Sequence, residues 1–539
     1  MMIAMNLISS ILLQSQIQPA GVGQIVLAVA PVLLLVALMG FLKMPGDKSS
    51  LITLLVTVLL AIFAFRFPLM DTSLSVLYGI LKAIFPILII IIMAIFSYNV
   101  LVFTGKMEII KQQFISISSD RAIQVLLLTW GFGSFLEGMA GFGTAVAIPA
   151  ALLISLGFKP VFSALVSLIA NSVATGFGAV GTPVKVLAEQ ARVTDIQTLS
   201  TQVIFQLSPL MILIPFVLMY LTEPKAKAIP KYVFVSLLVG VVSIVVQYLA
   251  ARYMGAETPA ILGSIASIIT IVLYAKISER KKGTTAAAEK AVSASTSDSL
   301  KAWSVYGLIL ALVILTSPLL PLREMLTPLL KTIFNFEIFN VASGKDVPHA
   351  VKIYWLVDTG ILLFLGSMLG GIIQGAGLGE LFKLLWKVFK QQKKTIVTVC
   401  SLIALSSVMD FSGMIGVIGV ALAFATGSYY PLFAPTIGCL GTFLTGSDTS
   451  SNILFGKLQA SVAHQIGENG SWLAAANTAG ATGGKIISPQ SIAVATSAIG
   501  QQGQEGAILK KAVPFALGYI VIAGLMVYFL PKILSGLLL

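Results

Sequence analysis

Apolar runs of membrane-spanning length recur along almost the whole chain. A transmembrane helix needs about 20 consecutive, mostly apolar residues. Runs near this length cover residues 22–42, 51–67, 76–103, 203–221, 232–250, 260–275, 303–320 and 513–530. With the glycine-broken apolar stretches at 122–190 and 395–500, they predict an all-α polytopic membrane protein with about 12 to 14 transmembrane helices. A composition of 57% hydrophobic and 10% charged residues excludes a soluble globular protein.

The formal net charge of +13 fits a membrane protein whose Lys and Arg residues gather in cytoplasmic loops, so it does not call for nucleic acid as a partner. The clearest basic loop covers residues 276–301 and has linker composition at its centre. We place this loop in the cytoplasm. It divides the chain into an N-terminal transmembrane half, residues 1–275, and a C-terminal transmembrane half, residues 302–539.

The two halves carry a weak internal repeat that can be aligned in two ways. Setting Pro160 on Pro431 gives an offset of 271 (431 − 160), and the same alignment brings Glu137 near Asp410 (410 − 137 = 273). A second alignment sets "GSFLEG" on "GTFLTG", then Asn171 on Asn477, 306 apart (477 − 171). We expect the offset near 272, because it runs through an amphipathic segment, a broken apolar pair and a polar motif in the same order. Repeats with interrupted helices indicate a secondary transporter.

Glu137, Asp410 and Asp448 stand inside apolar stretches, and Asp358 is a fourth acidic residue placed near a membrane interface. A carboxylate at the centre of a transmembrane helix costs about 2.5–3.5 kcal/mol on insertion scales, which makes each a functional candidate. The structural alternative is a carboxyl group that is hydrogen-bonded within a packed bundle. Glu137 and Asp410 are the candidates for carrying a proton.

Glycines surround Glu137 at positions 131, 133, 138, 141 and 143. Each glycine weakens a helix by about 1 kcal/mol relative to alanine, so the sequence predicts a hairpin or a broken helix here. Such backbone is tolerated at membrane depth only where protein or a water-filled cavity surrounds it. The alternative is close helix packing through small residues.

Polar side chains concentrate in the same glycine-broken runs. Hydroxyl and amide groups, together with free backbone N–H groups at helix ends, suit a small carboxylate that carries a hydroxyl group. We expect the substrate-binding residues to be Gly141, Thr144, Asn171, Ser172, Thr182, Lys185, Thr445, Asp448, Thr449, Ser450, Ser451, Asn452, Asn477, Thr478 and Lys485.

The sequence gives no support for an enzyme or for a bound cofactor. His349 and His464 stand alone, and Cys400 and Cys439 lie in apolar surroundings, so neither a metal site nor a disulfide is predicted. No phosphate-binding glycine pattern and no nucleophile with a base at useful spacing is present.

The blocks "FGSFLEGMAGFGTAVAIPAALLISLGF" and "LIANSVATGFGAVGTPV" resemble the bacterial lactate permease family. The later blocks "TFLTGSDTSSNILFGKLQ" and "NTAGATGGKIISPQSIAVA" are similar to that family as well, so the resemblance spans most of the chain. It implies a permease of the bacterial cytoplasmic membrane that moves L-lactate, and also D-lactate and glycolate, together with a proton. It further implies two repeated halves with re-entrant hairpins that work by an elevator movement.

A proton is also the coupling ion that elementary electrostatics favours. Bringing one anion into a cell that is negative inside costs about 2.3 kcal/mol per 100 mV, and one accompanying proton cancels this cost. The alternative is a sodium-coupled carboxylate or dicarboxylate transporter that uses Asn171, Asn452 and backbone carbonyls as ligands. An ion channel is a further alternative. The predicted partners are 2-hydroxy monocarboxylates and the lipid bilayer, and a homo-oligomer is left open.

Overall fold

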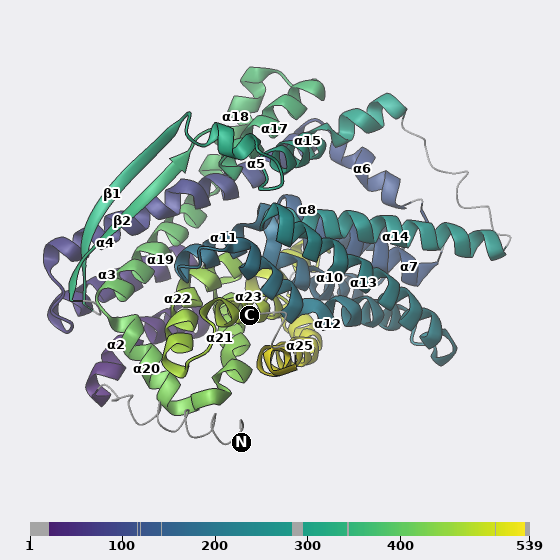
Figure 1. The fold of residues 1–539 in the computed structure, drawn as a ribbon. Coiled ribbons are helices and arrows are strands. Elements are labelled where there is room, and N and C mark those ends of the chain that lie inside the picture. Colours follow the sequence, from purple (N-terminus) through teal and green to yellow (C-terminus); the bar gives the residue numbers. More distant parts are fainter. Residues whose placement is uncertain are drawn as a thin grey trace.

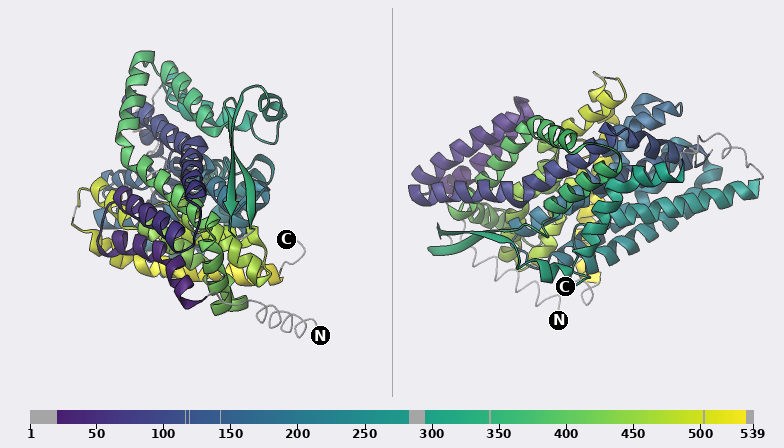
Figure 2. Two further views of the ribbon diagram at one scale, coloured as in Figure 1. Left: turned by 90° about the vertical axis from the view of Figure 1, so that its left-hand side faces the viewer. Right: turned by 90° about the horizontal axis from the view of Figure 1, so that it is seen from above.

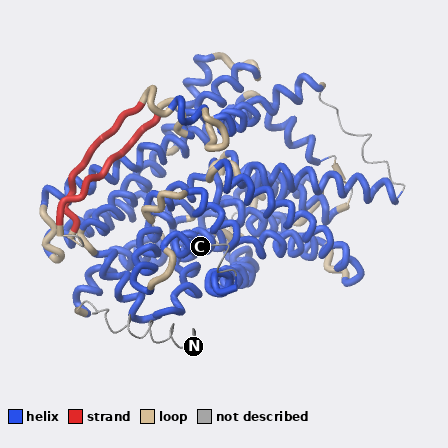
Figure 3. Tube along the Cα trace, viewed as in Figure 1, coloured by secondary structure: helices blue, strands red, loops and turns tan. Residues whose placement is uncertain are grey.

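The computed structural model describes residues 21–115, 117–118, 120–141, 143–282, 295–341, 344–501 and 503–533. These residues are almost entirely helical, and twelve of their helical segments are long and apolar enough to cross a membrane. The chain is therefore a polytopic all-α membrane protein, as its apolar runs predicted. Figure 1 shows the helices packed side by side in one bundle, and Figure 3 shows one pair of strands at its edge.

The helices before the linker begin with α2 (Val22–Val36), α3 (Gly46–Phe63), α4 (Leu69–Lys82), α5 (Ile89–Phe103) and α6 (Lys106–Ile115). They continue with α7 (Arg121–Val125), α8 (Ser134–Met139), α9 (Thr144–Ser155), α10 (Pro160–Ala174), α11 (Gly178–Gln190), α12 (Ile196–Thr222), α13 (Ile229–Met254) and α14 (Pro259–Lys282). A π-helical segment, Leu126–Gly133, joins α7 to α8.

The elements after the linker are α15 (Thr296–Leu315), α16 (Leu322–Leu326), strands β1 (Lys331–Asn340) and β2 (Lys345–Tyr354), α17 (Thr359–Ile373), α18 (Leu378–Gln391) and α19 (Lys393–Phe411). They end with α20 (Met414–Thr426), α21 (Tyr430–Thr445), α22 (Asp448–Ile466), α23 (Gly470–Gly484), α24 (Pro489–Ala498) and α25 (Glu505–Ile533). The boundaries predicted for the linker, 276–301, and for the two halves remain predictions, because residues 283–294 lie outside the described residues.

Two pairs of helices fold back on themselves as hairpins. In the first hairpin, α9 returns against the segment that ends in α8, and a Cβ atom at Gly133 would lie 3.2 Å from the carbonyl oxygen of Ala145. In the second, α22 returns against α21, where the Ser451 hydroxyl donates to the carbonyl of Gly438 at 2.7 Å. Both turns use glycines with left-handed φ, such as Gly143 at 85° and Gly446 at 71°. Glycine adopts this conformation without steric cost, so it permits the chain reversal.

A broken helix follows each hairpin. Helices α10 and α11 form one apolar segment of 31 residues that could cross a membrane. It is interrupted near Ala179 and Val180, which have φ of 43° and 54°. After the second hairpin, α23 ends at Gly484 and α24 begins at Pro489. Positive φ at alanine and valine is strained backbone, which persists only where the surrounding structure imposes it and which clusters at functional sites.

The order of these elements corrects the expected repeat. A hairpin, a broken helix and a long helix occur as α7–α9, α10–α11 and α12, and again as α21–α22, α23–α24 and α25. This order matches the alignment of Asn171 with Asn477, 306 apart (477 − 171). The offset near 272 is wrong, because it would set the broken helix α10–α11 against the second hairpin. Pro160 and Pro431 both stand in the first turn of a helix, a position that proline favours in any helix, so their match carried no information about the repeat.

The two repeats are inverted with respect to the membrane. Five lysines between residues 383 and 394 place α18 and the start of α19 on the cytoplasmic side. Tracing the chain from there, the first hairpin enters from the cytoplasm, and α19 ends on the outside. Helix α20 has only 13 residues, too few to cross the membrane, so the second hairpin enters from the outside. The hairpin turns therefore approach the middle of the membrane from opposite sides.

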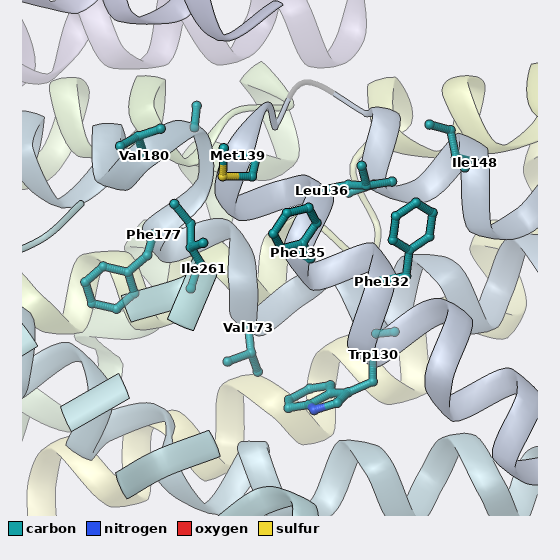
Figure 4. Close-up of a cluster of buried hydrophobic side chains, with 14 of the residues drawn as sticks. Trp130, Phe132, Phe135, Leu136, Met139, Ile148, Val173, Phe177, Val180 and Ile261 are labelled. Carbon is teal, nitrogen blue, oxygen red and sulfur yellow. The ribbon is translucent and has the colours of Figure 1, made fainter. Parts of the chain in front are cut away.

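The first hairpin is held in a dense apolar core. Figure 4 shows Phe135 and Leu136 of α8 among Phe177, Ile261 and other apolar side chains. A Cβ atom at Gly138 would lie 3.1 Å from the backbone nitrogen of Ile261 in α14. The hairpin thus packs directly onto its neighbours, which positions the residues near its turn.

No strand was predicted from the sequence. Strands β1 and β2 pair antiparallel, with Lys331 opposite Tyr354, and Figures 1 and 2 show them lying against the outside of the helix bundle. The backbone nitrogen of Phe339 donates to the Asp71 carboxylate at 2.9 Å, and the nitrogen of Val341 donates to the carbonyl of Phe411 at 3.0 Å. These contacts attach the strands to the outer ends of α4 and α19.

The contact between α21 and α23 predicts the effect of one substitution. A Cβ atom at Gly480 would overlap the carbonyl of Pro435, whereas one at Gly470, at the start of the same helix, would meet nothing within 4 Å. Gly480→Ala should therefore force the two helices apart and destabilise the protein by about 1–3 kcal/mol or more. Thermal unfolding of the detergent-solubilised protein measures this, with Gly470→Ala as the control. Equal unfolding midpoints for the two variants would contradict this packing.

Candidate functional site

A cavity of about 830 Å³ lies where the two hairpin turns and the two helix breaks meet. The first hairpin contributes Glu137, Gly141 and Gly143, and the first break contributes Thr175, Gly178, Ala179 and Pro183. The second hairpin contributes residues 443–450, and the second break contributes Lys485 and residues 489–492. The lining also reaches Lys43 and Lys394, at the cytoplasmic ends of α3 and α19, so this cavity extends toward the cytoplasm.

Glu137 lies at the turn of the first hairpin and is 4% exposed. Its Oε1 atom packs against the backbone of Gly178, where a Cβ atom would lie only 2.5 Å away, and Gly141 leaves room on another side at 3.4 Å. Its Oε2 atom is buried and has no hydrogen-bond partner among the described residues, although the side chain of Asn171 lies close by. The glycines therefore leave space for a carboxylate that faces the cavity, as the sequence suggested.

Asp448 and Lys485 are the charged residues of the cavity that interact with Glu137. Asp448 is the first residue of α22, and its Oδ1 atom accepts from the Thr442 hydroxyl at 3.1 Å. Its Oδ2 atom is buried and has no hydrogen-bond partner among the described residues. The Lys485 Nζ atom donates to the carbonyl of Gly446 at 2.9 Å and lies within electrostatic range of both carboxylates. One ammonium group thus faces two carboxylates.

Helix N-termini adjoin the same cavity. Ser447 caps α22 by accepting from the backbone nitrogen of Ser450 at 3.2 Å, and Ser488 caps α24. The first residues of both helices line the cavity. The backbone N–H groups and the dipole at a helix N-terminus favour an anion, so this part of the cavity suits a carboxylate.

The structure places most of the expected binding residues in three groups. Those that line the cavity are Gly141, Thr445, Asp448, Thr449, Ser450 and Lys485. A second group forms a buried hydrogen-bond network behind the cavity and consists of Ser451, Asn452, Asn477 and Thr478. Asn452 donates to the carbonyl of Pro183 at 2.9 Å, and Asn477 donates to the side-chain oxygen of Asn452 at 2.9 Å. Those whose hydroxyls bond to backbone carbonyls three residues earlier are Thr144, Ser172 and Thr182. Asn171 is buried beside Glu137.

Two further expected site residues, Lys185 and Asp410, do not line the cavity and form ion pairs elsewhere. Lys185 forms an ion pair with Glu257 at 2.6 Å and also donates to the hydroxyl of Thr359. Asp410 lies at the outer end of α19, where Arg192 contacts it at 2.7 Å and Lys457 at 3.3 Å. The cations that neutralise Asp410 come from distant parts of the chain, so the local sequence did not reveal these pairs.

The cavity also contains residues that were not predicted. Gly178 and Ala179 belong to the strained break, and the glycines in "TGFGAVG" were the available signal. Gln490 packs over Gly446, where any Cβ atom would overlap its side chain. No local pattern marked Gln490, because its role depends on the meeting of α24 with the second hairpin.

The chain is similar to known proteins in sequence and in fold. The L-lactate permease family model matches residues 24–534. An L-lactate permease from Streptococcus iniae is 40% identical, over 84% of this chain and 93% of that protein. Glycolate permease GlcA from Escherichia coli K12 is 33% identical, over 95% of this chain and 96% of that protein.

Among solved structures, MtrF of Neisseria gonorrhoeae, from a class of antimetabolite efflux pumps, aligns with a TM-score of 0.50 at 11% identity. The alignment covers 89% of this chain and 94% of MtrF, and the likeness concerns the fold alone. The family model covers nearly the whole chain and the relatives match over most of their length. The chain therefore belongs to the L-lactate permease family, and it is a multi-pass transport protein of the bacterial cell membrane and not an enzyme.

Proposed function

We propose that this protein takes up small 2-hydroxy monocarboxylates, namely L-lactate and also D-lactate and glycolate, together with protons. The observation that carries the proposal is the cavity in which Lys485 and two helix N-termini lie beside Glu137 and Asp448. The names of the relatives, L-lactate permease and glycolate permease, support the substrate class.

The cavity can recognise both functional groups of such a substrate. The ammonium group of Lys485 and the N-terminus of α22 attract the substrate carboxylate. The hydroxyls of Thr449 and Ser450, on the first turn of α22, line the same cavity and are available to hydrogen-bond the substrate's 2-hydroxyl group. Binding both groups from one helix end would favour a 2-hydroxy acid over a simple fatty acid.

The charges in the cavity give a reason for proton coupling. With Glu137 and Asp448 ionised and Lys485 protonated, the formal charge of this group is −1 (two carboxylates and one ammonium). A bound monocarboxylate would make it −2, in surroundings where an unpaired charge is expensive. One added proton restores −1. We assign this proton to Glu137. The Oε2 atom of Glu137 and the Oδ2 atom of Asp448 both lack a hydrogen bond among the described residues, but the Oδ1 atom of Asp448 accepts from the Thr442 hydroxyl, which favours the ionised form of Asp448.

Uptake by purified protein in sealed vesicles tests this function. With an inward proton gradient, L-lactate, D-lactate and glycolate should accumulate, and the 2-oxo acid pyruvate should be taken up less well. Replacing sodium with choline at constant pH should change nothing. A requirement for sodium would favour the sodium-coupled alternative, and carboxylate flux that never exceeds equilibrium would favour a channel.

A further inference from the structure

A second group of charged side chains lies at the C-terminal ends of α4, α11 and α19 and on α22. We call Lys82, Glu189, Arg192, Asp410 and Lys457 the outer charge cluster. Lys82 pairs with Glu189 at 3.5 Å, and Asp410 pairs with Arg192 at 2.7 Å and with Lys457 at 3.3 Å. None of these residues lines the cavity described above, so the proposed transport site does not explain them.

The carboxylate of Asp410 occupies a site built from two cations. The guanidinium of Arg192 and the ammonium of Lys457 hold it from separate places, the turn after α11 and the middle of α22. The side chains of Lys457 and Asp410 are 10% and 17% exposed, whereas that of Arg192 is 56% exposed and reaches solvent. The Arg192 side chain is therefore accessible to an anion from outside, whereas the Lys457 side chain is largely shielded from solvent.

The outer charge cluster has one more cation than anions, since three basic side chains face two acidic ones. The neighbouring imidazole of His349 on β2 packs against the ring of Phe411, with 4.8 Å between ring centroids. Burial, and then the nearby Arg192, lower the pKa of His349 to about 4, so it is neutral at physiological pH and adds no charge. The surplus positive charge attracts an anion from outside.

The cluster lies between the cavity and the outside. Helix α11 runs from Pro183, which lines the cavity, to its outer end beside Arg192, and α22 runs from Asp448 through Lys457. The two helices pack closely between these points, where a Cβ atom at Gly456 would lie 3.0 Å from the Leu187 side chain. A substrate that enters along this packed interface from outside would meet the cluster first.

We propose that the outer charge cluster is the first docking site for the substrate carboxylate, and that Asp410 occupies this site when no substrate is present. The external carboxylate would displace Asp410 from Arg192 and then move inward as α11 and α22 separate. This inference rests on the proposed function, because it assumes that the substrate is a small carboxylate that enters from outside.

Transport kinetics measured separately from each side of the membrane test this proposal. Arg192→Gln should raise the external KM for L-lactate uptake roughly tenfold at low ionic strength, and less at physiological ionic strength. The maximal rate and the KM for efflux from the cytoplasmic side should not change. Arg192→Lys keeps the positive charge, so it should raise the external KM less than Arg192→Gln does. Asp410→Asn removes the competing carboxylate, so it should lower the external KM.

Arg66→Gln is a matched control, because Arg66 is an exposed cation in the outer turn between α3 and α4. It should leave the external KM within about twofold of wild type, as expected for a distant surface charge. A folded Arg192→Gln variant with an unchanged external KM, or with equal changes on both sides, would overturn the docking role. If Arg192→Gln does not fold, an external KM in Asp410→Asn that is not lowered would overturn it. Failure of the wild-type protein to transport lactate would instead reject the proposed function.

Discussion

Glu137→Gln is expected to abolish proton-driven accumulation of lactate while leaving exchange of lactate across the membrane. Glutamine has nearly the same shape as glutamate but carries no titratable proton, so the carrier should still bind substrate and move. One pH unit corresponds to 1.36 kcal/mol, so an electroneutral one-proton symporter should accumulate lactate about tenfold across a gradient of one unit. The variant should reach a ratio of about one. Lactate accumulation and lactate counterflow in the same vesicles measure the two properties.

Asp448→Asn is the matched control for this experiment, because Asp448 is the other buried carboxylate that lines the cavity. It should keep the tenfold accumulation and show a raised KM, because Asp448 adjoins the proposed substrate position but does not carry the proton. If Glu137→Gln accumulated lactate to the wild-type ratio, Glu137 would not be the proton carrier.

Lys485→Gln is expected to reduce lactate uptake by about a hundredfold or more, because it removes a charge-assisted bond to the substrate carboxylate. Truncating one partner of a buried charge pair costs about 2–5 kcal/mol, and 2.7 kcal/mol is a hundredfold in binding. Initial rates over a range of lactate concentrations should show the loss mainly in KM. Lys394→Gln, at the cytoplasmic end of the same cavity, should change KM by about twofold or less, since it lies where solvent screens the charge.

Lys485 also neutralises Glu137 and Asp448, so its loss could disturb folding instead of binding. The double variant Lys485→Gln with Asp448→Asn separates these roles, because it restores the formal charge of the site. If Lys485 binds the substrate, the double variant should regain wild-type thermal stability but have a KM well above that of Asp448→Asn alone. A KM equal to that of Asp448→Asn alone would show that Lys485 acts only as a counter-ion.

Much of the site could be predicted from the sequence because its chemistry is rare in a membrane protein. A carboxylate such as Glu137 among glycines is expensive in lipid unless a cavity receives it, so the local sequence already indicated its surroundings. The hydroxyl-rich start of α22 and Lys485 were recognised for the same reason. Asp410 looks equally conspicuous in the sequence, yet it is neutralised at the outer end of α19 by Arg192 and Lys457.

The sequence by itself determined the class of fold and the residues that could carry charge inside the membrane. Hydropathy and glycine content act locally, so a span, a break or a buried acid is visible in a short stretch of chain. The tertiary structure decided the inverted pairing of the two hairpins, the strand pair outside the bundle and the separation of Asp410 from Glu137. Each of these depends on which distant segments pack together, and that choice is made by the shapes of whole helices in contact, which no short stretch of sequence contains.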